Sequence, residues 1–296
     1  MGTSDSSSPT VSLVTGANSG IGRATALKLA AEGHRVFAGM RSLDKGAKLL
    51  ELGAGLDITP VVVDVADDAS VTACAEEVLG AAGRLDVLVN NAGIGFNAVT
   101  EDIDIDAAKD CFDVNVWGAV RCVKAFGPGM RERRTGHIVN ISSIAGTMGL
   151  IAQPVYVGSK FALEGMSECL AQEMAPFGVR VSVIEPGVTR TAILPKNEGH
   201  PEPTDHSHAY ERMFEFYAAG VGANVQADLV ADTVHDALTA EHTQLRWVCA
   251  WGGEELVSGR PAMSDQQWVD LGAAATDQGG YAELYQQAFG LDLSPQ

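Results

Sequence analysis

The sequence predicts an α/β protein built on one doubly wound parallel sheet. From Val11 onward, short runs that are apolar throughout alternate with longer amphipathic segments. Strands buried on both faces have such runs, and an intervening helix makes successive strands parallel. Right-handed crossovers then leave a ligand crevice at the carboxyl ends of the strands. The expected strands are Val11–Thr15, Arg35–Met40, Thr59–Val65, Asp86–Asn90, His137–Ile141, Val179–Ile184 and Leu245–Ala250.

The segments between these runs predict the covering helices. After the sixth strand, Tyr210, Met213, Phe214 and Tyr217 fall at i, i+3, i+4 and i+7, which is one helical face. The other helices are expected at Ile21–Glu32, Asp44–Leu52, Ala69–Ala82, Asp104–Arg133, Val155–Phe177 and Gln226–Ala240, with two weaker pieces at Ser264–Ala275 and Tyr281–Phe289.

The chain of 296 residues is long enough for one large α/β domain. No repeat or linker divides it before about residue 190. We expect a flexible N-terminal tail (1–10), a catalytic domain (11–252) that includes a substrate lid segment (191–224), and a C-terminal extension (253–296) packed on the same domain.

Charge and cysteine content narrow the function classes. With 20 Lys and Arg against 38 Asp and Glu, the net charge of −18 argues against nucleic-acid and membrane-surface partners. The first ten residues lack the features of a signal peptide, and no apolar stretch approaches the ~18 residues of a membrane helix. The five cysteines are scattered, which is typical of buried free thiols in a reducing cytoplasm and gives no support for a metal site.

A glycine-rich turn follows the first strand directly. The stretch Thr15-Gly-Ala-Asn-Ser-Gly-Ile-Gly22 opens a helix, and its glycines let the backbone approach a pyrophosphate at the helix amino terminus. A plain glycine turn is the alternative interpretation, but the position between strand and helix favours a Rossmann-type dinucleotide site. The predicted contacts are Gly16, Asn18, Ser19, Gly20, Ile21 and Gly22.

The end of the second strand predicts the choice of dinucleotide. Met40 and Arg41 stand where a carboxylate would bind an adenosine ribose 2′-hydroxyl and favour NAD. A guanidinium suits a 2′-phosphate instead, so NADP(H) is the predicted cofactor and NAD the less favoured one. Asp64 either accepts a hydrogen bond from the adenine amino group or caps the following helix; the two roles are compatible.

Tyr156 and Lys160 are the candidate reacting pair. Positions i and i+4 share a helix face, and a phenol with a pKa near ~10 needs a nearby cation to exchange a proton at neutral pH. Ser143 follows the fifth strand at the same sheet edge, Asn90-Asn-Ala-Gly93 ends the fourth strand, and Asn115 lies inside a predicted helix.

These pieces, with Pro186–Thr191, resemble the short-chain dehydrogenase/reductase family in order and spacing over roughly residues 10 to 192. The resemblance implies that Tyr156 is the general acid in ketone reduction and the base in alcohol oxidation. It implies that Lys160 lowers the pKa of Tyr156 and binds the nicotinamide ribose, that Ser143 binds the substrate oxygen, and that Asn115 holds a helix kink and a water. The further implied cofactor contacts are Asp64, Val65, Asn91, Ala92, Gly93, Tyr156, Lys160, Pro186, Gly187, Thr189 and Thr191.

The same resemblance implies an oxidoreductase that interconverts a ketone or aldehyde and an alcohol, as a homodimer or homotetramer. The long C-terminal part puts the usual tetramer in question. The aromatic lid helix favours an apolar substrate of cyclic or aromatic character, and simple packing of these residues onto the core is the alternative interpretation. His200, His206 and His208 are expected to be exposed loop residues rather than metal ligands.

The alternative functions are a same-fold epimerase or dehydratase, which the glycine spacing disfavours, and a non-catalytic dinucleotide sensor, which would be expected to lack Ser143, Tyr156 or Lys160.

Overall fold

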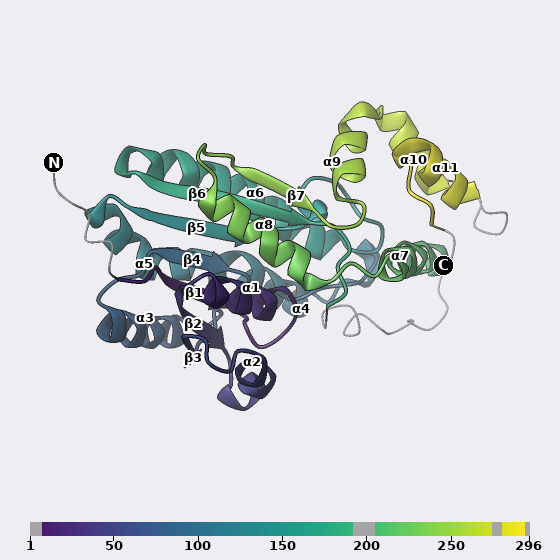
Figure 1. The fold of residues 1–296 in the computed structure, drawn as a ribbon. Coiled ribbons are helices and arrows are strands. Elements are labelled where there is room, and N and C mark those ends of the chain that lie inside the picture. The colour runs from purple at the N-terminus through teal and green to yellow at the C-terminus, as the bar shows by residue number, and fades with distance from the viewer. Residues whose placement is uncertain (1–7, 192–204, 274–279, 294–296) are drawn as a thin grey trace.

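A computed structural model describes residues 8–191, 205–273 and 280–293. Seven parallel strands form one sheet in the order β3-β2-β1-β4-β5-β6-β7 (Figure 1). The reversal of strand order beside β1 opens a crevice between β1 and β4, as in doubly wound folds. The strands are β1 (Val11–Thr15), β2 (Arg35–Met40), β3 (Ile58–Val62), β4 (Val87–Asn90), β5 (Gly136–Ile141), β6 (Val179–Pro186) and β7 (Arg246–Cys249).

Helices cover both faces of this sheet, which confirms the predicted fold class. Strand residues of one face pack against α3, α5 and α6, and those of the other face pack against α1, α2 and α8. The bounds are α1 (Gly20–Ala31), α2 (Ala47–Leu52), α3 (Asp68–Ala82), α4 (Ile105–Phe112), α5 (Gly118–Arg133), α6 (Pro154–Met174), α7 (Ser207–Gly222), α8 (Ala227–Thr239), α9 (Gly253–Ala262), α10 (Asp265–Ala273) and α11 (Gly280–Phe289). Single 3₁₀ turns lie at Leu43–Gly46, Thr100–Asp102, Ile144–Gly146 and Ala175–Phe177.

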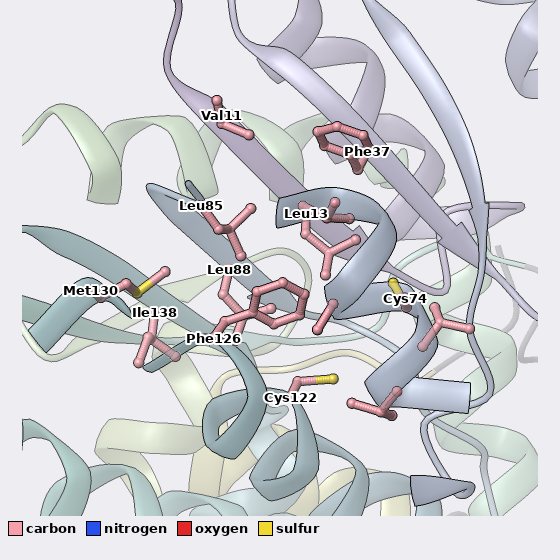
Figure 2. Packing of buried hydrophobic residues seen from close by; sticks show 14 of the residues in the cluster. Val11, Leu13, Phe37, Cys74, Leu85, Leu88, Cys122, Phe126, Met130 and Ile138 are labelled. Atoms are coloured by element: carbon pink, nitrogen blue, oxygen red, sulfur yellow. The ribbon is translucent and has the colours of Figure 1, made fainter. Parts of the chain in front are cut away.

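The core on the α3–α5 face is aliphatic and aromatic. Figure 2 shows Leu13 and Leu88 from neighbouring strands beside Phe126 of α5. All three side chains are at most 2% exposed. Burial of this kind contributes roughly 1.5–3 kcal/mol for each large side chain, so the strands are held firmly and their carboxyl ends form a rigid edge.

Three predicted elements differ from the structure. The helix expected over Asp104–Arg133 is divided into α4 and α5 by a π-helical turn at Asp113–Trp117. The expected C-terminal tail begins with helix α9, which the sequence pattern did not indicate because Gly259 and Pro261 weaken the helical signal. The strand β3 also ends at Val62, so Asp64 lies in the loop beyond it.

The C-terminal helices gather at one end of the sheet, next to α7 (Figure 1). Phe216 of α7 packs against Trp251 and Tyr285, with ring centroids 5.3 and 5.9 Å away. Residues of α9, α11 and the segment after α11 complete this apolar cluster. No helix in the described part of the chain combines the length and the apolar character needed to cross a membrane.

Candidate active site

A cavity of about 280 Å³ opens at the carboxyl ends of the strands. The loops after β1, β2, β3, β4, β5 and β6 all contribute to its lining, as expected for a crevice at a change of strand order. The structure brings every predicted dinucleotide contact to this one cavity: Gly16, Asn18, Ser19, Gly20, Ile21, Gly22, Arg41, Asp64, Val65, Asn91, Ala92, Gly93, Tyr156, Lys160, Pro186, Gly187, Thr189 and Thr191.

The backbone of the glycine turn adopts angles and packs at distances that a side chain would not allow. Gly16 and Gly20 have φ angles of +68° and +53°, which side-chain-bearing residues rarely adopt. A Cβ atom on Gly22 would lie 2.3 Å from Asn91 Nδ2 and 2.5 Å from the carbonyl oxygen of Gly16. Ser19 precedes α1 without a side-chain capping bond, so the first N–H groups of that helix remain available to an anion. These features fit the diphosphate of a dinucleotide.

Two cations line the cavity past the end of β2. Arg41 follows the strand directly, as predicted, and Lys45 lies in the 3₁₀ turn Leu43–Gly46. The sequence interpretation missed Lys45, although its position four residues after Arg41 was a usable signal. Asp64 lines the cavity too, but the residue that caps α3 is Asp67, whose carboxylate accepts from the Ala69 and Ser70 N–H groups. The capping role considered for Asp64 is therefore wrong.

Tyr156, Ser143 and Lys160 meet on the wall of the same cavity. Tyr156 and Lys160 come from the first two turns of α6, and Lys160 Nζ lies 5.8 Å from the centroid of the phenol ring. The Lys160 ammonium also donates to the carbonyl oxygen of Ile141 at 2.9 Å. Ser143, directly beyond β5, forms a hydrogen bond with the phenol of Tyr156. A phenol, a hydroxyl and an amine thus converge at one point.

Burial governs the protonation of this pair. It raises the pKa of Tyr156 to about 12, and the hydrogen bond with Ser143 opposes that rise. It lowers the pKa of Lys160 to about 8, because a desolvated ammonium is unfavourable. Tyr156 is therefore a neutral phenol near pH 7.

Asn115 sits behind this wall, in the π turn between α4 and α5. Its Oδ1 accepts from the backbone N–H of Ile94 at 2.8 Å, and its Nδ2 donates to the carbonyl oxygen of Ile94 at 2.9 Å. Nδ2 also donates to Ser159 Oγ at 3.0 Å. The amide thus fastens the loop after β4 to helix α6, and it does not line the cavity itself.

The other end of the cavity is apolar and aromatic. Phe216 and Tyr217 of α7 line it together with Leu150 and Val188, and the Tyr217 hydroxyl donates to Gln153 Oε1 at 2.9 Å. Of the four predicted lid residues, Tyr217 alone lines the cavity. The other three, Tyr210, Met213 and Phe214, pack in or against a separate cluster with Val99 and Ala152.

Sequence reasoning missed Phe216 and Gln153. Phe216 does not lie on the face defined by the i, i+3, i+4, i+7 spacing. Gln153 stands three residues before Tyr156, at the position that precedes α6. Part of the predicted lid segment, residues 192–204 with His200, lies outside the described residues.

The described residues contain no cluster of three potential metal ligands. His206 Nε2 lies 3.0 Å from Glu101 Oε2, in an ion pair at the surface. All five cysteines are free, and Cys169 is exposed rather than buried as the sequence suggested.

Comparison with known proteins places the chain in a family. The family model of short chain dehydrogenases matches residues 10–201. Human 17-beta-hydroxysteroid dehydrogenase type 1 is 38% identical over 80% of this chain and 76% of its own length. Human retinol dehydrogenase 8 is 44% identical over 60% of this chain and 58% of its own length.

Solved structures agree with this result. A short-chain dehydrogenase from Streptomyces avermitilis superposes with a TM-score of 0.77 at 32% identity, covering 90% of this chain and 96% of that one. A Burkholderia phymatum relative in complex with NAD has a TM-score of 0.71 at 29% identity, covering 80% and 88% of the two chains. A metagenomic oxidoreductase in complex with NADP has a TM-score of 0.65 at 28% identity, covering 80% and 95%. The chain therefore belongs to the short-chain dehydrogenase family, and it is an NAD(P)-dependent oxidoreductase.

Proposed function

We propose that this enzyme interconverts a ketone or aldehyde and an alcohol with NADP(H), and that its substrate is apolar and carries a ring. The observation that carries the proposal is the convergence of Ser143, Tyr156 and Lys160 on one wall of the cavity. A glycine turn lies at one end of that cavity and aromatic side chains lie at the other.

The chemistry follows from what each group can donate or accept. A bound nicotinamide supplies or takes up the hydride. During reduction, Tyr156 gives its phenol proton to the substrate oxygen as negative charge develops there, and the Ser143 hydroxyl donates a hydrogen bond to the same oxygen. During oxidation, the Tyr156 phenolate takes the proton from the alcohol. Lys160, as the ammonium, stabilises the phenolate in either direction.

The preference for NADP(H) rests on Arg41 and Lys45. A 2′-phosphate carries negative charge and several acceptor oxygens, which suit a guanidinium and an ammonium at the rim of the cavity. The position at the end of β2 that would hold a carboxylate in an NAD enzyme carries Met40 and Arg41 instead.

The substrate class rests on the aromatic end of the cavity. Leu150, Val188, Phe216 and Tyr217 present apolar surface within reach of Ser143 and Tyr156, and Gln153 adds a polar group. Apolar pockets with a few polar groups are typical of sites for ring-bearing ligands. The names of two relatives, a hydroxysteroid dehydrogenase and a retinol dehydrogenase, support the same class.

The test is a screen of cyclic and aromatic ketones and alcohols with both dinucleotides, followed at the absorbance of reduced nicotinamide. We expect turnover with NADP(H), and we expect Tyr156→Phe to lower kcat at least about 100-fold because it removes the general acid. Dinucleotide binding by this variant should stay within about threefold of the wild-type value, since the aromatic ring remains. The control is Tyr281→Phe in α11, a phenol outside the cavity. Near-normal turnover by Tyr156→Phe would refute the assignment.

We further propose a homodimer, because α4, α5 and α6 are the helices through which this family commonly pairs. Trp117 in the π turn and Phe161 on α6 are 50% and 45% exposed, which is unusual for large apolar side chains. A cytoplasmic location and the absence of nucleic-acid and membrane partners stay predictions from the sequence.

A further inference from the structure

Three charged side chains that the proposed reaction does not use lie close together near Lys160. Arg246 of β7 places its Nε 3.1 Å from Glu164 Oε2 of α6 and 3.1 Å from Glu185 Oε1 of β6. The Glu164 side chain is 6% exposed and that of Glu185 is fully buried. A third carboxylate, that of Glu168, meets Arg246 Nη2 at 2.7 Å but is 53% exposed.

One guanidinium cannot neutralise two buried carboxylates. Apart from the ion pair with Arg246, both oxygens of Glu185 lack a hydrogen-bond donor within the described part of the chain, as does Oε1 of Glu164. Burial raises the pKa of Glu185 to about 7. Glu185 therefore takes up a proton near neutral pH. Burial raises the pKa of Glu164 as well, while Ser142 and the Arg246 guanidinium oppose that rise. Glu164 Oε2 accepts a hydrogen bond from Arg246 Nε at 3.1 Å, which neither oxygen of Glu185 does, so Glu164 is the carboxylate that Arg246 favours in its charged form.

Glu164 lies one helical turn beyond Lys160. Residues at i and i+4 share a helix face, and both side chains are buried, where charges interact strongly. Burial lowers the pKa of Lys160, while negative charge at Cys111 and Glu164 would raise it. Burial also raises the pKa of the Cys111 thiol, so Cys111 stays neutral near pH 7. Glu164 is then the negative charge that acts on Lys160.

We propose that Glu164 is a positioning residue that keeps Lys160 in its ammonium form, and that Arg246 holds the Glu164 carboxylate in place. The inference rests on the proposed function, in which the Lys160 ammonium stabilises the Tyr156 phenolate. It assigns Glu164 no contact with substrate or dinucleotide. Its effect is on the pH range in which the reacting pair works.

Other titratable groups face this cluster from every neighbouring element and belong in the same account. Tyr156 of α6 and Cys111 of α4 face Lys160, and Glu168 of α6 shares Arg246 with Glu164. Glu254 of α9 and Cys249 of β7 face Glu185. Among these groups, Glu164 combines a buried carboxylate with a place one turn from Lys160 on the same helix.

The decisive comparison is Glu164→Gln against Glu168→Gln. Both changes remove one carboxylate that pairs with Arg246, but only the first removes a buried charge one turn from Lys160. The probe is the ¹⁵N signal of the side-chain amine in lysine-labelled protein without dinucleotide, assigned with Lys160→Arg. We expect the wild-type amine to titrate near pH 8, Glu164→Gln to lower that midpoint by about one unit, and Glu168→Gln to leave it unchanged.

The pH profile of kcat supplies the second measurement. Because Lys160 loses its proton at a lower pH in Glu164→Gln, the alkaline limb of its kcat profile should move to lower pH by about one unit. Glu164→Asp keeps the charge and should restore most of the wild-type profile. If Glu164→Gln does not fold, the double variant Glu164→Gln/Arg246→Met replaces it, with a smaller shift expected in the same direction.

An unchanged Lys160 midpoint in Glu164→Gln, or an equal shift in Glu168→Gln, overturns the inference. A wild-type enzyme that turns over no carbonyl or alcohol with either dinucleotide overturns the proposed function instead. In that case the ¹⁵N titration still decides whether Glu164 sets the charge of Lys160.

Discussion

Arg41 and Lys45 are the two residues on which the proposed preference for NADP(H) rests. Both line the cavity beyond β2, and the nearby Lys48 does not, since it lies in α2 and pairs with Glu51 at 3.0 Å. Arg41 was predictable because it directly follows a strand whose end is visible in the sequence. Lys45 was not predicted, because its position depends on the 3₁₀ turn that folds the loop back toward the cavity.

These cations lead to a prediction about cofactor choice. Each charge-assisted hydrogen bond contributes about 1.5–3 kcal/mol, and 1.4 kcal/mol corresponds to a tenfold change. Arg41→Asp should therefore lower the ratio of kcat/KM for NADPH over NADH at least about tenfold, and Lys45→Ala should lower it by a smaller factor. The measurement is steady-state kinetics with both dinucleotides, and Lys48→Ala is the matched control. Equal selectivity in Arg41→Asp and the wild type would remove Arg41 as the phosphate contact.

At the level of elements, helix α7 carries two tyrosines with different surroundings, two turns apart. Tyr210 is buried and accepts a hydrogen bond from the Val99 N–H at 3.1 Å, which ties the helix to the loop after β4. Tyr217 lines the cavity and reaches Gln153. The packing interpretation is thus confirmed for Tyr210, and the substrate interpretation stays a prediction for Tyr217.

Matched changes in these two residues separate the two interpretations. Tyr217→Leu should raise KM for an apolar substrate about tenfold, because it removes aromatic surface from the cavity wall. It should also lower the free energy of unfolding by about 1 kcal/mol, since the hydrogen bond to Gln153 is lost. Tyr210→Phe should likewise lower the free energy of unfolding by about 1 kcal/mol, since a buried hydrogen bond is lost, but leave KM unchanged. Kinetics and urea unfolding of both variants check this. An unchanged KM in Tyr217→Leu, together with a lower free energy of unfolding, would show that Tyr217 serves packing alone.

The elements also show where sequence reasoning reaches its limit. Apolar runs located all seven strands within a few residues, because burial on both faces leaves a local pattern. The division of the helix at Asn115 left no such pattern, since the π turn accompanies hydrogen bonds to Ile94, a residue from a distant loop. For the same reason Gln153 and Phe216 were missed. Contacts between separate helices and loops bring Gln153 and Phe216 to the cavity. Such contacts leave no signal in the local sequence pattern.

The exposed side chains of Trp117 and Phe161 lead to a prediction about the whole molecule. If two copies pair through this surface, Trp117→Glu or Phe161→Glu should convert the dimer to a monomer, because a carboxylate would be buried without a partner. Sedimentation velocity at micromolar concentration measures this. Leu52→Glu, in α2 on the opposite face of the sheet, is the control, since Leu52 is 52% exposed and should leave the assembly intact. A wild-type monomer would contradict the proposal.

The packing of α7 on Trp251 and Tyr285 has a consequence for how such enzymes diverge. The residues that match the family end at residue 201, and they include Ser143, Tyr156 and Lys160. Phe216 and Tyr217 of the cavity wall lie beyond that point, and Phe216 packs against Trp251 and Tyr285. Under the proposed function, substitutions in the last third of the polypeptide would alter the choice of substrate and leave the residues proposed for hydride transfer in place.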